Sequence, residues 1–482
     1  MSSESRDTRC DLLVVGGGPA GLSAAGVAAR CSLRTVLVDE RASLGGQIYR
    51  QPGRGFRITK ARLLGRDHAR GAQLRADTAA SGAELRSGTT VLSLRGTTAV
   101  CLAAGGETTT LAARRVLISP GAHDRPVVFP GWDLPGVITA GGAQALVKAS
   151  RVSPGDRVAF VGSGPLALAF PAQLHHYGVN VVLALEAGPA PRPADVVALL
   201  AAGRGNTELL ADGLRYRAQL VRARVPLRYG RIIVRAEGDA RVEEIVHSAV
   251  DHEWRPIAGS EERLAVNTVC VGYGFVPSAE LFRLLGCAFV DDDDLGGPVV
   301  VVDEWQRTTV EGISAAGDGT GVRGAPVAKA QGRLAAIGLA RDLGALSTTD
   351  AERLAAPQRR LLAGKERFRR ALLRLYGVGE GIYELATPET VVCRCEEVVH
   401  GDLERAVRSS ADVNVIKSYT RAGMGLCQGR NCSRHIAALV ARRSGVPLKD
   451  VPGATARPPV RPVPLGALAD DTIRDAGLFT RG

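Results

Sequence analysis

The sequence contains no uninterrupted apolar run of the length that crosses a membrane. Its longest uncharged stretch, residues 12–29, includes five glycines and a proline, and these residues interrupt a membrane helix. Residues 1–11 are polar and mixed in charge, without the basic segment followed by an apolar segment that marks a secretory signal. We therefore expect no transmembrane segment and a cytoplasmic location, with membrane association left open only through a partner protein.

Lysine is scarce, which bears on the origin of the positive charge. The chain has 61 basic and 49 acidic side chains, a formal net charge of +12, yet only six of the basic residues are lysine. A composition rich in arginine, alanine and glycine is what a GC-rich genome produces without selection for binding a polyanion. The basic residues are scattered except near residues 359–374. We therefore expect no nucleic-acid partner.

Closely spaced cysteine pairs are missing from the first 390 residues. No C-x-x-C or C-x4-C motif occurs there, and Gln47, not a cysteine, follows Gly45 and Gly46. Reduction of disulfides needs a reactive cysteine pair beside the redox cofactor, so the sequence excludes that chemistry. Five of the nine cysteines stand alone in apolar or turn sequences, as thiols do in a reducing cytoplasm. These five are Cys10, Cys31, Cys101, Cys270 and Cys287.

The sequence does contain enough apolar residues to build several cores. Its 482 residues are 45% hydrophobic and 23% charged, which predicts about two to four globular domains rather than a disordered chain. Two segments follow the order strand, glycine-rich turn, helix, strand. Their predicted elements are strands 11–15 and 35–38 around a helix at 20–30, and strands 157–161 and 179–185 around a helix at 166–176.

The second of these units is predicted to be inserted into the domain formed by the first. Three later apolar segments that end in or near glycine, 116–121, 268–274 and 312–318, are expected to rejoin the first domain's sheet. After residue 345 an arginine-rich helix is expected at 351–376, followed by four cysteines between residues 391 and 432. The predicted parts are a first nucleotide-binding domain at 1–150 and 266–345, an inserted nucleotide-binding domain at 151–265, a helical linker at 346–388, a cysteine domain at 389–446 and an extended tail at 447–482.

The first glycine-rich turn is a specific nucleotide-binding signal. Residues 16–21, GGGPAG, match G-x-G-x-x-G directly after a strand and at the start of a helix. Gly16 permits the tight turn, Gly18 lets the backbone approach a pyrophosphate, and Gly21 allows close packing of helix on strand. The helix N-terminus offers free N–H groups to the phosphates, and Asp39 at the end of the next strand can accept hydrogen bonds from a ribose.

Two further motifs indicate that this nucleotide is a flavin. Residues 44–47, LGGQ, and 312–319, GISAAGDG, resemble the corresponding segments of flavoproteins with two dinucleotide-binding domains, as does the strand and turn at 114–122. The resemblance implies FAD, with Asp318 reaching its ribityl and phosphate part. The predicted binding residues are Gly16, Gly18, Pro19, Ala20, Gly21, Asp39, Glu40, Gly46, Gln47, Gly121, Gly317 and Asp318.

The second glycine-rich turn, residues 162–167, has alanine in its third glycine position and is a weaker match. Gly162 and Gly164 would form the turn, and Glu186 would bind ribose hydroxyls and repel a 2′-phosphate. A nicotinamide cofactor at this turn would therefore be NAD and not NADP. The alternative, that this domain is a structural or regulatory remnant without nicotinamide chemistry, stays open.

The last four cysteines are predicted to hold a metal. Cys393 and Cys395 form a C-x-C pair, and Cys427 and Cys432 a C-x4-C pair, which suits zinc or an iron–sulfur cluster. The C-x-C spacing is unusual for structural zinc and favours iron–sulfur, and capped helices are expected near 401–407 and 433–443. The segment resembles the [2Fe-2S] domain of bacterioferritin-associated ferredoxins, although many of those close with C-x2-C. The expected fold is α/β, with two Rossmann-like domains of a flavoprotein and a small, mostly helical C-terminal [2Fe-2S] domain.

Taken together, the motifs resemble the electron-transferring subunit of heteromeric amino-acid and opine dehydrogenases. The match rests on CRCEEV at 393–398, TRAGMG at 420–425, CQGR at 427–430 and PGWDLPGV at 130–137, and it covers roughly residues 11–465. The group includes the A subunit of opine oxidase, the α subunits of hydroxyproline and dye-linked proline dehydrogenases, and the corresponding subunit of hydrogen cyanide synthase.

The resemblance implies that a separate flavin-bearing β subunit of amino-acid-oxidase type oxidises the amine, and that this chain relays the electrons through FAD and the cluster. It also implies a possible small third subunit, an FMN at a subunit interface, and another adenine nucleotide as an alternative to FAD. We expect no catalytic residue in this chain, since His123 and His252 lie in predicted loops. Two other hypotheses stay open: a self-contained NADH oxidoreductase with FAD and [2Fe-2S], and a binding module with decayed flavin sites.

Overall fold

The computed structural model describes residues 8–53, 55–59, 64–203 and 205–469, which lie in two compact units. Of these residues, the first unit takes those up to Ala122, then Pro277–Ala363, and those from Thr455 onward; the second takes His123–Val276 and Gly364–Ala454. Residues 1–7, which begin the polar N-terminal segment, and 470–482, which end the predicted tail, lie outside the described residues. No helix in the described part combines the length and apolar character that spanning a bilayer needs.

A seven-stranded mixed sheet lies at the centre of the first unit. Its strands are β1 (Thr8–Val15), β2 (Thr35–Asp39), β3 (Glu84–Ser87), β4 (Thr89–Arg95), β5 (Thr98–Ala103), β6 (Thr108–Ile118) and β19 (Ile313–Ala315). Their order is β3-β2-β1-β6-β5-β4, and β19 pairs with the last residues of β6. The pairs among β3, β2, β1, β6 and β19 are parallel, whereas β4, β5 and β6 are antiparallel.

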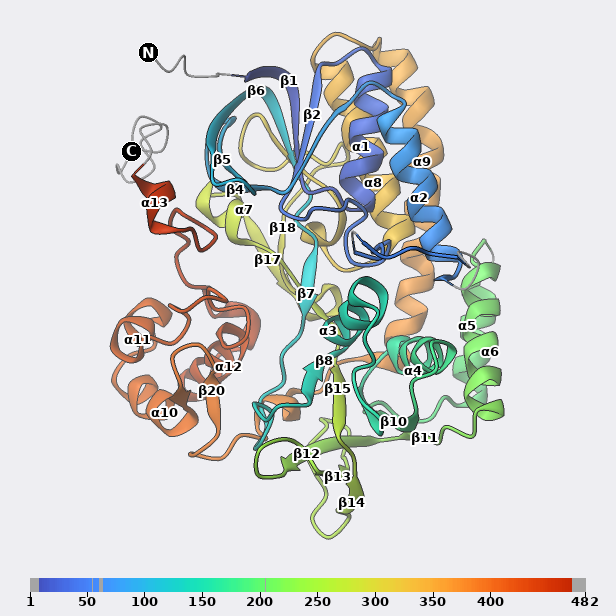
Figure 1. Cartoon of the computed structure of the whole chain (residues 1–482), viewed down its shortest axis with the longest axis vertical. Helices are drawn as coiled ribbons and strands as arrows, with labels where there is room; N and C mark the ends of the chain where they lie inside the picture. The colour runs from blue at the N-terminus through green and yellow to red at the C-terminus, as the bar shows by residue number, and fades with distance from the viewer. Residues whose placement is uncertain (1–7, 54, 60–63, 204, 470–482) are drawn as a thin grey trace. The chain divides into compact units, whose positions relative to one another are not determined.

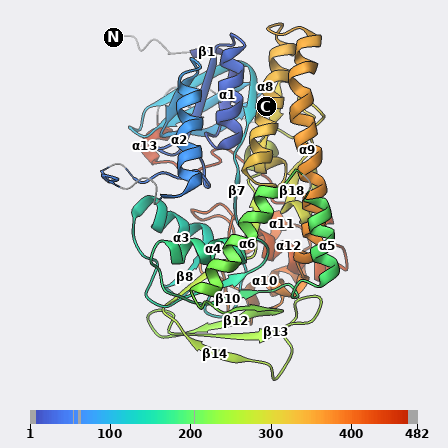
Figure 2. The same ribbon diagram turned by 90° about the vertical axis from the view of Figure 1, so that its right-hand side faces the viewer.

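Both faces of this sheet are buried, which explains why residues 12–15 at the end of β1 are all apolar. Leu12 and Val14 belong to one buried cluster and Leu13 and Val15 to another, because successive side chains point to opposite faces of a strand. Figure 2 shows α1 between α2 and α8. The remaining elements are α1 (Pro19–Arg30), α2 (Arg66–Ala79), α7 (Glu280–Leu284), α8 (Ala325–Asp342), α13 (Leu465–Leu468), the hairpin β17 (Phe289–Asp292) and β18 (Gly297–Val300), and 3₁₀ turns η3 (Asp293–Leu295) and η4 (Gly317–Thr320).

The second unit contains a five-stranded parallel sheet of order β11-β10-β9-β15-β8. The strands are β8 (Val137–Thr139), β9 (Val158–Gly162), β10 (Val181–Glu186), β11 (Leu227–Tyr229) and β15 (Thr268–Gly272), and its helices are α3 (Ala140–Ala145), η2 (Leu146–Ser150), α4 (Leu166–His176), α5 (Pro193–Ala202) and α6 (Thr207–Arg222). A separate antiparallel sheet, visible in Figure 1, consists of β12 (Arg231–Glu237), β13 (Glu244–Ala249) and β14 (Glu262–Ala265).

One predicted strand pairing is wrong. Residues 268–274 were expected to rejoin the first sheet, but β15 pairs with β9 and β8 in the second sheet. An apolar strand that ends in glycine fits either parallel sheet, so its sequence does not specify its neighbour. Likewise β8 lies in the second sheet, although its residues fall within the range 1–150 predicted for the first domain.

The cysteine segment packs on the second unit's sheet and shares its core. One buried cluster runs from Val161 and Val271 in the sheet to Val392, Leu403 and Ile436 in the cysteine segment. In Figure 1, the helices α10, α11 and α12 lie around the short strand β20, which ends at the first of these cysteines. Its elements are η5 (Glu380–Tyr383), β20 (Val391–Cys393), β21 (Val398–Val399), α10 (His400–Ser409), α11 (Val413–Thr420), α12 (Ser433–Ser444) and η6 (Leu448–Asp450); the chain also forms a two-stranded sheet of β7 (Ala122–Asp124) and β16 (Phe275–Pro277).

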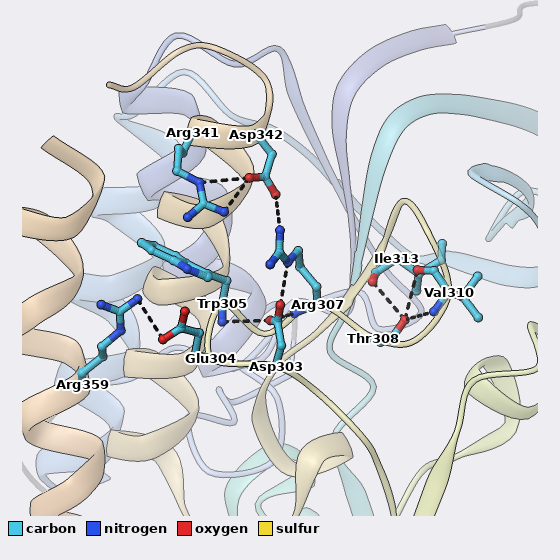
Figure 3. A network of polar contacts seen from close by, with 10 residues as sticks. All are labelled: Asp303, Glu304, Trp305, Arg307, Thr308, Val310, Ile313, Arg341, Asp342 and Arg359. Carbon is cyan, nitrogen blue, oxygen red and sulfur yellow. Dashed lines mark hydrogen bonds and ion pairs between the residues drawn. The ribbon is translucent and has the colours of Figure 1, made fainter. Parts of the chain in front are cut away.

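The long helix α9 (Thr348–Tyr376) confirms the helix expected at 351–376, and its first half packs on the first unit. Trp305 is buried between two guanidinium groups, 4.2 Å from Cζ of Arg341 on α8 and 4.4 Å from Cζ of Arg359 on α9 (Figure 3). Asp342 pairs with Arg341 at 2.7 Å and with Arg307 at 3.5 Å. The arginine-rich helix is thus tied to α8 through the ring of Trp305, which lies between Arg341 and Arg359.

Candidate functional site

The first glycine-rich turn joins β1 to α1, and packing requires two of its glycines. Gly16 has φ +101°, and a Cβ placed on it would lie 2.2 Å from the carbonyl oxygen of Ser119. A Cβ on Gly21 would lie 1.8 Å from the oxygen of Gly16, so helix and strand approach closely there. The Ser119 hydroxyl donates a hydrogen bond to the Gly16 oxygen at 2.9 Å. The turn has the tight geometry that the motif predicts.

Gly18 is different, because its side is open. It caps α1 without a side-chain hydrogen bond, and the nearest atom to a Cβ placed on it is Cα of Gly46 at 3.9 Å. Pro19, which has no backbone N–H, and Ala20 follow in the first turn of α1, where an anion can meet the N–H groups of the residues after Pro19. Gly46 lies against Gly18, and its φ is +64°. The open backbone and the uncapped helix suit a pyrophosphate.

The acidic pair at the end of β2 lies beside this turn. Asp39 accepts hydrogen bonds from the backbone N–H groups of Gly17 at 2.6 Å and Arg41 at 2.8 Å, and burial raises the pKa of Asp39. Its side chain stays partly exposed, so a ribose can reach it. Glu40 is exposed and pairs with Arg461 at 3.2 Å, a residue of the C-terminal segment that the sequence motifs did not indicate.

Gln47 is exposed, and its side-chain oxygen accepts hydrogen bonds from Arg41 at 3.4 Å and from Arg50. It therefore lies on the outer side of the loop that follows β2. Gly121 has φ +73°, and its oxygen accepts a hydrogen bond from the N–H of Ser278 at 3.0 Å. A Cβ on Gly121 would meet no atom within 4 Å, so this turn too is open on one side.

The predicted flavin residues after β19 come against α1. A Cβ on Gly317 would lie 3.0 Å from Cβ of Ala20. Burial raises the pKa of Asp318, while the backbone N–H groups of Arg323 and Gly324 stabilise its carboxylate. The structure therefore brings the two halves of the predicted FAD site, distant in sequence, into one region of the first unit.

Gln331 on α8 holds this turn in place, and the sequence motifs did not indicate it. It is 2% exposed, accepts a hydrogen bond from the Gly317 N–H at 3.1 Å and donates one to the Thr320 hydroxyl at 2.9 Å. The Thr320 hydroxyl in turn donates to the Gly317 oxygen at 2.9 Å. A single glutamine in an otherwise alanine-rich buried helix was the available signal, because a buried amide needs partners.

The second glycine-rich turn joins β9 to α4. Gly162 packs against the Gly272 oxygen, which a Cβ would approach to 2.2 Å, whereas a Cβ on Gly164 would meet nothing within 4 Å. Glu186 is 1% exposed and accepts hydrogen bonds from the backbone N–H groups of Gly164 at 2.9 Å and Gly188 at 2.8 Å. Burial raises the pKa of Glu186 to about 7.

The four C-terminal cysteines come together from two places in the second unit. Cys393 ends β20, and Cys395 follows it in the connection to β21, while Cys427 lies in a turn and Cys432 caps α12. Cys393 and Cys432 are buried and their thiols are hydrogen-bonded to each other; the thiols of Cys395 and Cys427 form a second pair. Cys395 is exposed.

The surroundings of Cys393 favour its thiolate form. The hydrogen bond from Cys432 lowers the pKa of Cys393 to about 5, helped by backbone N–H groups that include that of Gly423, 3.5 Å from Sγ. The hydrogen bond to Cys393 and its own burial raise the pKa of Cys432. A Cβ on Gly425 would lie 2.3 Å from Cβ of Cys395, so glycine is required for the loop to pass this cysteine.

The positions of these cysteines bear on the kind of metal site that they could form. Among the described residues, no group of three or more histidine, cysteine, aspartate or glutamate side chains is placed as a single metal ion requires. A [2Fe-2S] cluster takes two protein ligands on each iron, so four thiols in two pairs are the donors that it would need. The helices α10 and α12 agree with those expected at 401–407 and 433–443, and α11 lies between them.

Two of the isolated cysteines, Cys10 and Cys101, are buried. Burial raises the pKa of Cys10 to about 11 and that of Cys101 to about 12, which keeps these thiols protonated. His252 is 87% exposed and lies 3.7 Å from Glu253. His123 lies in β7.

Comparison with known protein families agrees with this geometry. Residues 10–332 match the model of the family described as pyridine nucleotide-disulphide oxidoreductase, and residues 387–472 match the sarcosine oxidase A3 domain. Hydrogen cyanide synthase subunit HcnB of Pseudomonas aeruginosa is 36% identical over 94% of this chain and 97% of its own length. The A subunit of opine oxidase from Agrobacterium tumefaciens is 33% identical over 95% of this chain and 91% of its own length.

Two solved structures share the fold. L-proline dehydrogenase from P. horikoshii has a TM-score of 0.67 at 20% identity, and the match covers 97% of this chain and 81% of that one. Thioredoxin reductase from T. acidophilum has a TM-score of 0.52 at 22% identity, and the match covers 70% of this chain and 99% of that one. The match thus covers nearly all of the reductase and part of this chain.

Proposed function

The chain belongs to the pyridine nucleotide-disulphide oxidoreductase family, and from this membership we propose that it is the electron-transferring subunit of a heteromeric amino-acid or opine dehydrogenase. Related chains are named as subunits of hydrogen cyanide synthase and of opine oxidase, and this chain is accordingly a flavoprotein oxidoreductase subunit. The observation that carries the finer proposal is the combination of an open nucleotide turn in one unit with two thiol pairs in the other.

We propose that the first turn holds FAD. Gly16, Gly18 and Gly21 shape the turn, the first residues of α1 present N–H groups to the pyrophosphate, and Asp39 accepts from the ribose. The Gly317 turn, fixed by Gln331, brings Asp318 close to the start of α1. The fold leaves another adenine nucleotide as an alternative occupant, because these residues recognise the adenosine and pyrophosphate that both share.

We propose that Cys393, Cys395, Cys427 and Cys432 hold a [2Fe-2S] cluster. When bound, FAD exchanges electrons in pairs and the cluster exchanges them singly, so together they suit a relay between a two-electron donor and a one-electron acceptor. The chain's own part is to lower the pKa of Cys393 through Cys432 and the Gly423 N–H, and to leave Cys395 at the surface.

The donor is proposed to be a flavin-bearing β subunit of amino-acid-oxidase type, accompanied by FMN at a subunit interface and by a small third subunit. Support comes from the relatives' own names, which describe them as subunits of opine oxidase and hydrogen cyanide synthase. The substrate class is then an opine, proline, hydroxyproline or glycine. A self-contained NADH oxidoreductase is the alternative, and the second glycine-rich turn is the feature that favours it.

The cofactor proposal is tested by metal and flavin analysis of the purified full-length chain. We expect FAD and about two irons per chain. Cys395→Ser should remove the iron and the associated visible absorption while FAD remains, whereas Cys31→Ser, at an isolated cysteine, should retain both. Unchanged iron in Cys395→Ser would refute the ligand assignment.

The relay proposal is tested by dye reduction with opines, proline, hydroxyproline or glycine as donors. The chain alone should give no substrate-dependent rate, and the rate should appear when an amino-acid-oxidase-type flavoprotein subunit is co-expressed with it. Amine oxidation by the chain alone would contradict the proposal.

A further inference from the structure

The two strand–turn–helix–strand units of this chain share one local construction. Asp39 at the end of β2 and Glu186 at the end of β10 each accept a hydrogen bond from a glycine of their own turn. Each also accepts one from the N–H two residues further along, at 2.8 Å in both units. The units differ in what lies over the carboxylate: Asp39 is partly exposed, whereas Glu186 is 1% exposed.

The last turn of α9 packs at the end of β10, beside Glu186. A Cβ placed on Gly188 would lie 2.9 Å from the carbonyl oxygen of Leu375 and 3.2 Å from Oε1 of Glu186, so the α9 backbone and this carboxyl both lie next to Gly188. Leu375 is itself buried. Burial and the charge of Glu186 both raise the pKa of Tyr376, which places the end of α9 within electrostatic range of the carboxylate.

This last turn is anchored on both sides within the second unit. Before it, Lys365 donates to the side-chain oxygen of Asn206 at 2.6 Å, and Asn206 is 2% exposed. After it, the Gly381 N–H donates to the Glu253 oxygen at 2.8 Å, and a Cβ on Gly379 would lie 2.5 Å from the ring of Trp254. Lifting the turn from Glu186 therefore means breaking buried contacts at both ends.

A dinucleotide bound at such a turn needs its ribose hydroxyls to reach the carboxylate at the end of the second strand. In this chain Glu186 is 1% exposed, and the backbone of α9 packs against Gly188, two residues further along. A ribose would have to displace packed protein groups to reach this carboxyl, and the free energy lost would have to be offset by its own hydrogen bonds.

We infer that the second glycine-rich turn does not accept NAD(H), and that Leu375 and Tyr376 at the end of α9 are the residues that exclude it. The exclusion of NAD(H) does not depend on the proposed function. Only its consequence does, namely that electrons enter from a partner subunit and not from a nicotinamide. The family match thus predicts a pyridine-nucleotide site that the residues present do not fit.

The test is calorimetric titration of NAD⁺ into the full-length chain as purified, with Glu186→Ala and Asp39→Ala as variants. We expect no saturable binding up to about 1 mM NAD⁺, which corresponds to a binding free energy weaker than about −4.1 kcal/mol. Binding that Asp39→Ala removes and Glu186→Ala leaves unchanged would place the nucleotide at the first turn and agree with the inference. Binding that Glu186→Ala abolishes while Asp39→Ala leaves it unchanged would overturn the inference.

A second measurement does not depend on any variant. Hydrogen exchange of the amides around Gly188 should be slow and unchanged by 5 mM NAD⁺, because the last turn of α9 already covers them. If NAD⁺ slowed the exchange of these amides, it would bind at the second glycine-rich turn, and the inference would be wrong. The subunit proposal fails by a different result, amine oxidation without a partner, so the two failures are distinguishable.

Discussion

At the scale of single residues, the glycines of the first turn have separate tasks. Gly16 and Gly21 are required because backbone atoms of Ser119 and Gly16 leave no room for a Cβ. Gly18 is free of that constraint, and its open side faces the region where the motif places a pyrophosphate. Substitutions at these positions therefore separate folding from cofactor binding.

In Gly18→Ala, the free energy of unfolding of the flavin-free chain should stay within about 1 kcal/mol of the wild-type value, while FAD binding should weaken about tenfold. Gly16→Ala should destabilise the flavin-free chain by about 2 kcal/mol or more, since its positive φ and the Ser119 oxygen both oppose a side chain. Unfolding curves together with FAD titration check this. Equal loss of stability in both variants would argue against the separation.

The buried carboxyl of Glu186 should make stability depend on pH. Its pKa is raised from an ordinary value of 4.5 to about 7, so the folded chain binds a proton that the unfolded chain releases between these values. The protonated Glu186 carboxyl therefore contributes to the free energy of unfolding at low pH. This contribution is lost as pH rises from about 4.5 to 7, with a slope of up to about 1.4 kcal/mol per pH unit. Comparing urea unfolding of wild type and Glu186→Gln from pH 5 to 8 should show the wild type losing stability relative to the variant. A constant difference across that range would exclude this role.

At the scale of elements, α9 connects the two units and is held differently in each. In the first unit it packs on α8 through the stacked side chains of Arg341, Trp305 and Arg359 (Figure 3). In the second unit its last turn packs beside Glu186 and leads into the cysteine segment. The arginine-rich character of this helix thus serves internal packing, at Arg359 at least.

Trp305→Ala should destabilise the first unit by about 3 to 5 kcal/mol, because it opens a cavity next to Ile337 and Leu334 and removes two cation–π contacts. Denaturant unfolding followed by flavin fluorescence measures the loss. Arg353→Ala on the same helix is the matched control: its side chain is 69% exposed, and we expect a change within about 0.5 kcal/mol. A loss of less than about 1 kcal/mol in Trp305→Ala would show that the stack does not hold α9.

At the scale of the whole molecule, the two proposed cofactor sites lie in different compact units. The open nucleotide turn belongs to the first unit, and the four cysteines share a core with the sheet of the second. Each site is built from residues of its own unit, so each cofactor should be lost without the other.

Removal of iron by a chelator under anaerobic, reducing conditions should leave the ratio of FAD to protein unchanged within about 10%. Conversely, Asp39→Ala should lower FAD content while iron content stays at the wild-type value. Flavin and iron analysis of the same samples checks both directions. Joint loss of the two cofactors would show that the sites depend on one another.

Much of the fold followed from local patterns. The periodicity of apolar residues and the positions of turn residues predicted the apolar strands, the glycine turns and the helices at 166–176 and 351–376. Both signals depend only on residues that are close together in the sequence. Strand partners are not local in this sense. β15 carries the same apolar signal as the strands of either sheet, and its place beside β9 is decided by where the inserted segment folds.

The candidate site divides in the same way. The motif residues Gly16, Gly18 and Asp39, and the spacing of the four cysteines, could be identified from the sequence because each motif's chemistry is carried by neighbours along the chain. The supporting residues Gln331 and Arg461 could not, because they reach the site from distant elements.

By itself, the sequence determined the family, the two nucleotide turns and the identity of the four thiols, since these depend on which residues follow one another. Only the tertiary structure decided how the thiols pair and whether each turn is open. The two turns have similar sequences and similar local hydrogen bonds, yet Asp39 remains accessible while Glu186 is buried beside a helix about 190 residues later in the chain. Accessibility is set by what packs over a residue, and that depends on the path of the whole chain.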